Sequence, residues 1–266
     1  MPDMHEVDYR IVGDDMQLVE VELDPHEAVV AEAGGMMYME DGIAMDTIFG
    51  DGSRPGGGLW DKLVGAGKRV LTGESMFMTV FHHEGTGKKK VAFAAPIPGK
   101  ILPVHLATLG GELIAQKDSF LAAAKGVAIG IAFQKRLRVG FFGGEGFILQ
   151  RLQGDGWAFL NACGTLVERD LAAGERLRVD TGCLVAFTPT VHYDVELVSN
   201  VKSMLFSGEG LFLTTLTGPG HVWLQSLPFG RLAGRIYAAM PRTGGGRREE
   251  GSLLGTLGGM LDGDNQ

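Results

Sequence analysis

The sequence predicts a nearly all-β protein in which one sheet unit recurs along the chain. Three observations support this prediction: abundant glycine, a recurring hairpin pattern, and short runs in which apolar and charged residues alternate. Glycine accounts for 42 of the 266 residues, which is about twice its usual share of ~7%. Because glycine tolerates the positive φ angles of tight turns, this excess is typical of many short strands joined by tight turns.

One hairpin pattern returns at three places in the chain. Gly144–Leu149 reads GEGFIL, and Gly208–Leu213 repeats it as GEGLFL. An earlier copy begins at Gly73 and reaches its turn at Gly85. Each copy has the order strand, G-x-G turn, strand, which is typical of a β-hairpin.

A second pattern lies between these hairpins. Leu171–Glu175 leads into an apolar strand, and Leu23–Glu27 leads into another one with the same spacing of apolar residues and glycine. A weaker copy runs from Leu106 to Ile114. Apolar and charged residues alternate strictly over residues 176–180, so we expect a strand with one buried and one solvated face.

We therefore expect a single β domain over residues 1–241, followed by a flexible, glycine-rich tail over residues 242–266. The domain would contain three units, each a hairpin with a second strand pair. The last hairpin is expected to pair with the N-terminal unit, because an uncovered strand pair would expose sheet edges. The expected units are residues 5–72 completed by 208–241, residues 73–143, and residues 144–207.

One segment departs from the β pattern. Residues 59–71 follow a glycine-rich loop and place Trp60 and Leu63 on one apolar stripe at helical spacing. This spacing predicts one short helix. Its apolar stripe is a candidate contact with a partner.

The charge of the chain limits its partners. The formal net charge of −8 argues against a general nucleic-acid-binding protein, because phosphate binding needs a basic face. Lys88, Lys89 and Lys90 form a local basic run at a predicted hairpin turn. This run is a candidate contact with an acidic partner, although a solvated hairpin tip explains the same residues.

A metal site is the one chemical site that the sequence offers. On a strand, His192, Asp194 and Glu196 would share one face and could ligate a metal ion. The H-x-H pair from which such sites usually start is missing, and a hydrated outer face explains the same residues. Cys163 and Cys183 lie in apolar strands, where a buried thiol is inert. We therefore expect no catalytic site and no cofactor.

The cellular location follows from the cysteines and the N-terminus. Two cysteines without C-x-x-C spacing form neither a disulfide framework nor a zinc site. The first residues lack the basic region and apolar core of a signal peptide. We expect a cytoplasmic protein.

Four segments together resemble one known family. These segments look like the tryptophan-attenuator-like family of unknown function, which has fungal relatives called altered-inheritance-of-mitochondria proteins; they are Gly73–Phe77, Gly144–Leu152, Gly174–Glu175 with Asp180–Cys183, and Gln225–Phe229. The resemblance covers about residues 5–240. It implies three subdomains, each with the short double-stranded β-helix fold of the tryptophan RNA-binding attenuation protein. It also implies a homotrimer in which three chains form a ring of nine units.

The leading hypothesis is a non-enzymatic, cytoplasmic, ring-forming assembly or scaffold protein that binds a protein or membrane-surface partner. The first alternative is a ring that binds a small molecule or RNA. In the attenuation protein the RNA-binding basic residues repeat around the ring, whereas here the triple lysine occurs in one unit only. The second alternative is a metal-dependent enzyme that uses His192, Asp194 and Glu196.

Overall fold

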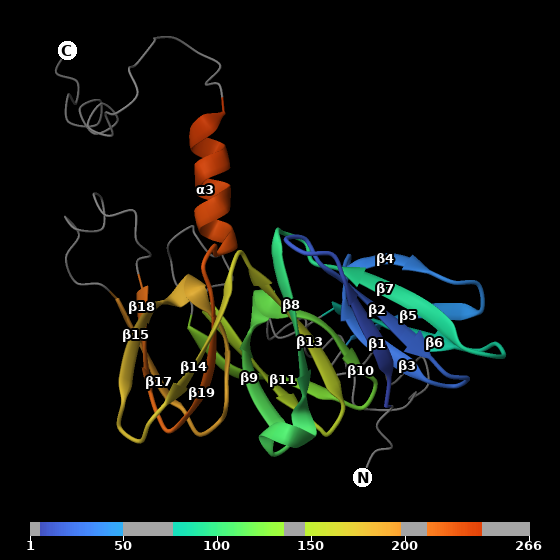
Figure 1. Ribbon diagram of the computed structural model, residues 1–266, viewed down its shortest axis with the longest axis horizontal. Helices are drawn as coiled ribbons and strands as arrows, with labels where there is room; N and C mark the ends of the chain where they lie inside the picture. The colour runs from blue at the N-terminus through green and yellow to red at the C-terminus, as the bar shows by residue number, and fades with distance from the viewer. Residues whose placement is uncertain (1–5, 50–76, 136–146, 198–211, 241–266) are drawn as a thin grey trace, which may run out of the picture. The chain divides into compact units, whose positions relative to one another are not determined.

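The computed structural model describes residues 6–49, 77–135, 147–197 and 212–240 (Figure 1). These residues form β-sheets and one α-helix, so the predicted nearly all-β class is confirmed. The chain divides into two compact units, Met1–Leu232 and Ala233–Gln266, and every strand among the described residues belongs to the first.

An N-terminal segment comprises β1 to β7. Strand β6 lies between β5 and β3, while β7 lies between β2 and β4, and β1 extends the second of these sheets beyond β2. The strands are β1 (Asp8–Val12), β2 (Leu18–Leu23), β3 (Ala28–Glu32), β4 (Met36–Met39), β5 (Ile43–Phe49), β6 (Phe77–His83) and β7 (Lys89–Ala94).

A middle segment pairs its six strands in the same order. Strand β12 lies between β11 and β9, and β13 lies between β8 and β10. The strands are β8 (Gly99–His105), β9 (Glu112–Gln116), β10 (Phe120–Ala124), β11 (Ala128–Lys135), β12 (Phe147–Gln153) and β13 (Trp157–Cys163).

A C-terminal segment shows this order once more. Strand β18 lies between β17 and β15, and β19 lies between β14 and β16. The strands are β14 (Leu166–Leu171), β15 (Arg176–Asp180), β16 (Leu184–Phe187), β17 (His192–Leu197), β18 (Phe212–Thr217) and β19 (Gly220–Gln225).

The helical elements are short. Single 3-10 turns occupy Leu106–Leu109, Lys117–Ser119 and Thr181–Cys183, and helix α3 spans Phe229–Ala239. Helix α3 follows Pro228 and places Phe229, Leu232 and Ile236 at helical spacing. In the described part of the chain, no helix is both long and apolar enough to cross a membrane.

Neighbouring segments are joined by strand pairing. Strand β3 pairs with β10, which fuses two three-stranded sheets into one six-stranded sheet with the order β5-β6-β3-β10-β13-β8. Strand β9 pairs with β16 in the same way, which gives the order β11-β12-β9-β16-β19-β14. We call these two pairings the first joint and the second joint.

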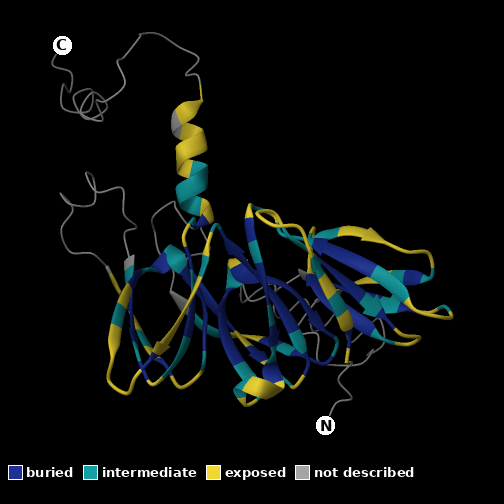
Figure 2. Cartoon of the chain, viewed as in Figure 1, coloured by how far each residue is buried: buried dark blue, intermediate teal, exposed yellow. Residues whose placement is uncertain are grey.

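Each joint is buried on both faces of its sheet. In β13, Phe159 packs with the core of the N-terminal segment and the next residue, Leu160, packs with the core of the middle segment. In β3, Val29 packs in the core of the N-terminal segment and Val30 packs in the core of the middle segment. Figure 2 accordingly shows dark blue, buried residues along these strands. Burial of each large apolar side chain stabilises the fold by about 1.5–3 kcal/mol, so the two segments cannot separate without loss of both cores.

Turns of one kind precede β3 and β15, and the 3-10 turn before β9 ends in the same left-handed backbone conformation. His26, Gly110 and Gly174 hold equivalent places in these turns and have φ angles of 75°, 78° and 77°. In the first and third turns, the side chain of Glu27 or Glu175 accepts a hydrogen bond from a backbone amide three residues earlier, at 2.8 Å and 2.9 Å. The spacing shared by Leu23–Glu27 and Leu171–Glu175 therefore encodes one turn geometry.

The expected boundaries of the units were wrong. The hairpin of β18 and β19 pairs with β14 to β17 and completes the C-terminal segment, not the N-terminal one. The N-terminal segment is completed instead by the hairpin of β6 and β7, over residues 77–94. The division between compact units falls at Leu232 and Ala233, not at residue 241.

The helices also differ from expectation. Helix α3 lies inside the region that the sequence assigned to the β domain. The predicted helix over residues 59–71 and the predicted flexible tail over residues 242–266 lie outside the described residues.

The turn geometry predicts opposite effects of two alanine substitutions. Gly174→Ala should lower the free energy of unfolding by about 1 kcal/mol, because a side chain is strained at its φ of 77°. Gly130→Ala is the matched control and should raise the free energy of unfolding slightly, because Gly130 lies in β11 without a positive φ. An added Cβ at either glycine meets no atom within 4 Å. Urea denaturation measures both, and equal stabilities of the two variants would contradict this account.

Candidate functional site

Two sheet edges are the most unusual surfaces of this fold. Strand β4 ends the four-stranded sheet, and β15 ends the three-stranded sheet. In the pairing order, β4 holds the place of β10 and β16, while β15 holds the place of β3 and β9. Those four strands form the first and second joints. The chain therefore presents one half of a joint at β4 and the other half at β15.

The two joints have the same geometry. In the first joint Ala122 lies opposite Ala31, and in the second joint Ala186 lies opposite Ala115. Both β10 and β16 also carry a one-residue register shift against the hairpin strand on their other side. Strand β4 carries this shift at the same place, between Met36 and Tyr38. Its local backbone is therefore built like that of the two strands that form joints.

The bulged residue of each strand shows what the β4 edge lacks. The side chains of Leu121 in β10 and Val185 in β16 are 1% and 0% exposed. Met37 holds this place in β4 and is 58% exposed (Figure 2, where β4 is yellow). Leu121 packs in the core of the preceding segment, with Val29 among others. Met37 is thus an apolar side chain without the core that its counterparts have.

An aromatic ring pairs with an alanine at the next position of all three strands. Phe159 lies opposite Ala122 in the first joint, and Trp223 lies opposite Ala186 in the second. In the N-terminal segment the aromatic residue and the alanine exchange strands: Tyr38 of β4 lies opposite Ala92 of β7.

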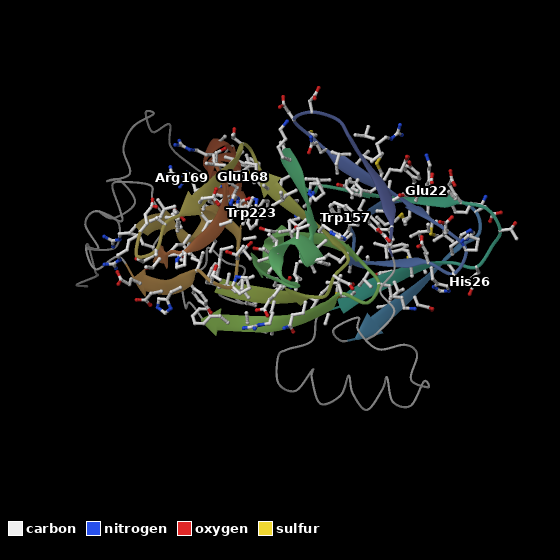
Figure 3. All side chains as sticks on the ribbon, turned by 60° about the horizontal axis from the view of Figure 1, so that its bottom comes forward. Glu22, His26, Trp157, Glu168, Arg169 and Trp223 are labelled. Atoms are coloured by element: carbon white, nitrogen blue, oxygen red, sulfur yellow. The ribbon has the colours of Figure 1, made fainter. Side chains whose placement is uncertain are left out.

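This exchange keeps one aromatic ring at the same place of each sheet face. The rings in the two joints are covered, since Phe159 is 0% and Trp223 is 6% exposed, whereas Tyr38 is 37% exposed. Figure 3 labels Trp223 and also Trp157, which precedes Phe159 by two residues in β13. Both tryptophans lie among the side chains of their sheets. Tyr38 has the volume to fill a joint and is left uncovered.

The β15 edge is also less buried than its counterparts. Leu177 is half-buried and Arg178 is exposed, whereas Leu113 and Ile114 at the same places of β9 are buried. Val179 is buried, and with Leu177 it borders the core of the C-terminal segment. This edge therefore offers apolar side chains flanked by a positive charge.

A polar network covers the face of the sheet next to Tyr38. The carboxylate of Glu20 accepts hydrogen bonds from the Tyr38 hydroxyl, from Lys90 Nζ at 3.0 Å and from Arg10 Nη2 at 3.1 Å. The bonds from Tyr38 and Lys90 lower the pKa of Glu20, while the same contact raises the pKa of Tyr38. The network fixes the tyrosine ring beside the β4 edge.

The lysine run belongs mostly to this sheet face. Lys88 Nζ lies 2.9 Å from Asp8 Oδ2 and 2.9 Å from Glu22 Oε1, and these partners raise its pKa. Lys90 forms an ion pair with Glu20, and Lys89 lies in β7 opposite Leu23. The positive charges of Lys88 and Lys90 are balanced within the chain, so the run is not a basic patch.

The predicted metal ligands lie on one strand face, as their spacing indicates. His192, Asp194 and Glu196 of β17 are all exposed, and Glu196 Oε2 lies 3.6 Å from Arg178 Nη2. Within the residues that the structure describes, no group of three or more His, Cys, Asp or Glu side chains is placed to hold a metal ion.

The remaining predicted residues add no chemistry. Burial raises the pKa of the Cys163 thiol to about 11, which keeps it protonated and inert. Cys183 lies in the 3-10 turn before β16. Trp60 and Leu63, the predicted partner contacts, lie outside the described residues.

The sequence reasoning did not find Met37 and Tyr38. A signal was present, because the MMYM run begins as many residues after His26 as the FLAAA run begins after Gly110, and these two residues hold equivalent places in their turns. Alignment of these two runs would have shown bulky exposed side chains where the middle segment has alanine.

Comparisons with known proteins cover the whole β region. A family model described as "Mitochondrial biogenesis AIM24" matches residues 9–227. An uncharacterized protein from Streptococcus pyogenes serotype M6 is 30% identical over 227 residues, which cover 84% of this chain and 87% of that protein. A crystal structure of a protein from Streptococcus pyogenes, a structural genomics target, matches with a TM-score of 0.69 at 25% identity, over 88% of this chain and all of that chain.

The Glu20 network predicts a pH-dependent contribution to stability. Because the pKa of Glu20 is lowered from 4.5, its stabilising effect is present above that value and is lost as the pH falls through the lower folded-state pKa. Glu20→Gln should therefore lower the urea midpoint at pH 7, and its difference from the wild type should shrink below about pH 4.

The matched control is Glu22→Gln on the same strand face. Its carboxylate contacts only the exposed Lys88, so its midpoint at pH 7 should fall less than that of Glu20→Gln. Equal losses in the two variants at pH 7 would count against a special role of the Glu20 network.

Proposed function

The chain belongs to the family described as mitochondrial biogenesis AIM24, and we propose that it is a non-enzymatic assembly protein whose copies join head to tail into a ring. One observation carries the proposal: β4 and β15 are the two unpaired halves of a joint that the chain already forms twice. We infer that the three segments are copies of one attenuation-protein-like unit, and that a third joint forms between β15 of one copy and β4 of the next.

The register of the third joint follows from the first two. Because Ala122 and Ala186 lie opposite Ala31 and Ala115, the equivalent Tyr38 would lie opposite Val179 of the neighbouring copy. Met39 would then lie opposite Arg178. This register puts the Tyr38 ring on the face that Phe159 and Trp223 occupy in their joints, and it covers the apolar border formed by Leu177 and Val179.

A head-to-tail contact has to close into a ring or grow into a filament. Both intrachain joints use one register, so each successive segment would be added by the same operation, and closure is proposed on the resemblance to the attenuation protein. Three copies would supply nine units, the ring that the resemblance to the tryptophan RNA-binding attenuation protein implies. The product of such an assembly is a scaffold, whose outer surfaces would bind a protein or membrane-surface partner.

The two alternatives receive less support. An RNA-binding ring needs unpaired positive charge, and Lys88 and Lys90 are held by Asp8, Glu22 and Glu20. A metal-dependent enzyme needs a ligand cluster, and the described residues contain none. We also propose a cytoplasmic location, because the chain has two cysteines and the Cys163 thiol is free and buried, as expected in a reducing compartment.

The proposal predicts a defined mass in solution. Light scattering and native mass spectrometry should find three copies of the 28.4 kDa chain. Tyr38→Ala removes the aromatic ring from the third joint, so this variant should weaken self-association at least about tenfold, as loss of a central aromatic side chain does in other interfaces. A wild type that stays monomeric at all concentrations would refute the ring.

A second variant restores an aromatic side chain at the position that Phe159 occupies in the first joint. Tyr38→Ala with Ala92→Phe recreates the pairing of Ala122 with Phe159, so assembly should recover relative to Tyr38→Ala alone. Circular dichroism of each variant checks that the fold is intact. A double variant that assembles no better than the folded single variant would contradict the proposed equivalence of the three joints.

A further inference from the structure

We propose that Met37 is an oxidation-sensitive latch of the assembly: its sulfoxide keeps a chain from joining the next copy. The inference rests on the proposed ring and names a control of its third joint. It starts from one difference between the joints, namely that the bulged residue is Leu121 in the first joint, Val185 in the second and Met37 in the open edge.

The burial of the two counterparts indicates where Met37 goes. Leu121 belongs to the core of the preceding segment with Val29 and Ala31, and Val185 belongs to the core around Leu113 and Ala115. The corresponding residues of the C-terminal segment are Leu177 and Val179. In the third joint the thioether of Met37 would therefore enter an apolar site beside these two residues of the neighbouring copy.

Oxidation changes this side chain alone among the three. A peroxide transfers one oxygen atom to the thioether sulfur; the sulfur loses two electrons and the peroxide is reduced to water or an alcohol. The product carries a polar S=O group that needs a hydrogen-bond donor, and burying it in an apolar site is unfavourable. Leucine and valine have no such reaction, so the two intrachain joints keep their strength while the joint between copies is lost.

Accessibility favours the same residue. Met37 is 58% exposed in the single chain, so a peroxide can reach it before assembly or during exchange of copies. Met39 of the same strand is less exposed, and its counterparts Ala123 and Phe187 pack in the cores of their own segments. Met16 and Met45 are also exposed but lie outside β4. They provide internal references for oxidation that does not touch the β4 edge.

The test uses the full-length protein and hydrogen peroxide. After partial oxidation, size-exclusion chromatography separates assembled from monomeric protein, and peptide mass spectrometry measures the sulfoxide at each methionine in both fractions. Met37 sulfoxide should be enriched at least about tenfold in the monomer, whereas Met16 sulfoxide and Met45 sulfoxide should distribute evenly. An even distribution of Met37 sulfoxide between the monomeric and assembled fractions would overturn the inference.

The matched variant replaces Met37 by the residue of the first joint. Met37→Leu should assemble as the wild type does and should stay assembled after peroxide, while Met16→Leu should remain as sensitive as the wild type. If Met37→Leu is lost from the assembly to the same extent as the wild type, another methionine is responsible and the inference fails. If the untreated wild type is monomeric, the ring itself fails, so the two proposals are refuted by different results.

Discussion

The pairing of β3 with β10, and of β9 with β16, is the interaction on which the rest of the structure depends. Each pairing makes one sheet belong to two segments, so that Phe159 and Leu160, adjacent in β13, pack into different cores. No segment can therefore complete its core alone, which is the behaviour of repeat proteins whose stability comes from neighbours. It follows that the first and last segments are each left with one incomplete side, at β4 and β15.

The incomplete side at β4 differs from the intrachain joints in its chemistry. In the middle segment the corresponding sheet face is apolar, with Phe159 between Ala122 and Pro103. In the N-terminal segment the equivalent row reads Arg10, Glu20, Ala92 and Tyr38, with the tyrosine hydroxyl bound to the carboxylate. A surface that has to be exposed to water before copies meet needs such polar groups, whereas an intrachain joint does not. The charged network thus keeps this sheet face polar without removing the aromatic ring.

The sequence predicted local structure well and long-range pairing poorly, for a physical reason. Alternation over residues 176–180 and the shared turn at Leu23–Glu27 and Leu171–Glu175 depend on backbone geometry within a few residues. Similarity between hairpins shows that two strands are alike, but partner choice depends on which apolar faces are covered, so the hairpin at 212–225 was assigned to the wrong segment. Helix α3 was missed because Phe229, Leu232 and Ile236 were taken as part of a strand region. The β4 site was missed because an exposed methionine is informative only beside its buried counterparts.

An open edge that carries Met37, Tyr38 and Met39 is an aggregation hazard, because an unpaired strand can pair with strands of other chains. Two features of β4 restrict this. The strand has four residues and a bulge, so only a short partner with a matching register can pair with it. The β15 edge places exposed Arg176 and Arg178 on either side of Leu177, so pairing of two β15 strands would bring arginine side chains together, which is unfavourable although Arg178 also contacts Glu196. Pairing of β4 with β15 is the combination that neither feature opposes, and this selectivity is what makes a head-to-tail assembly of one chain physically reasonable.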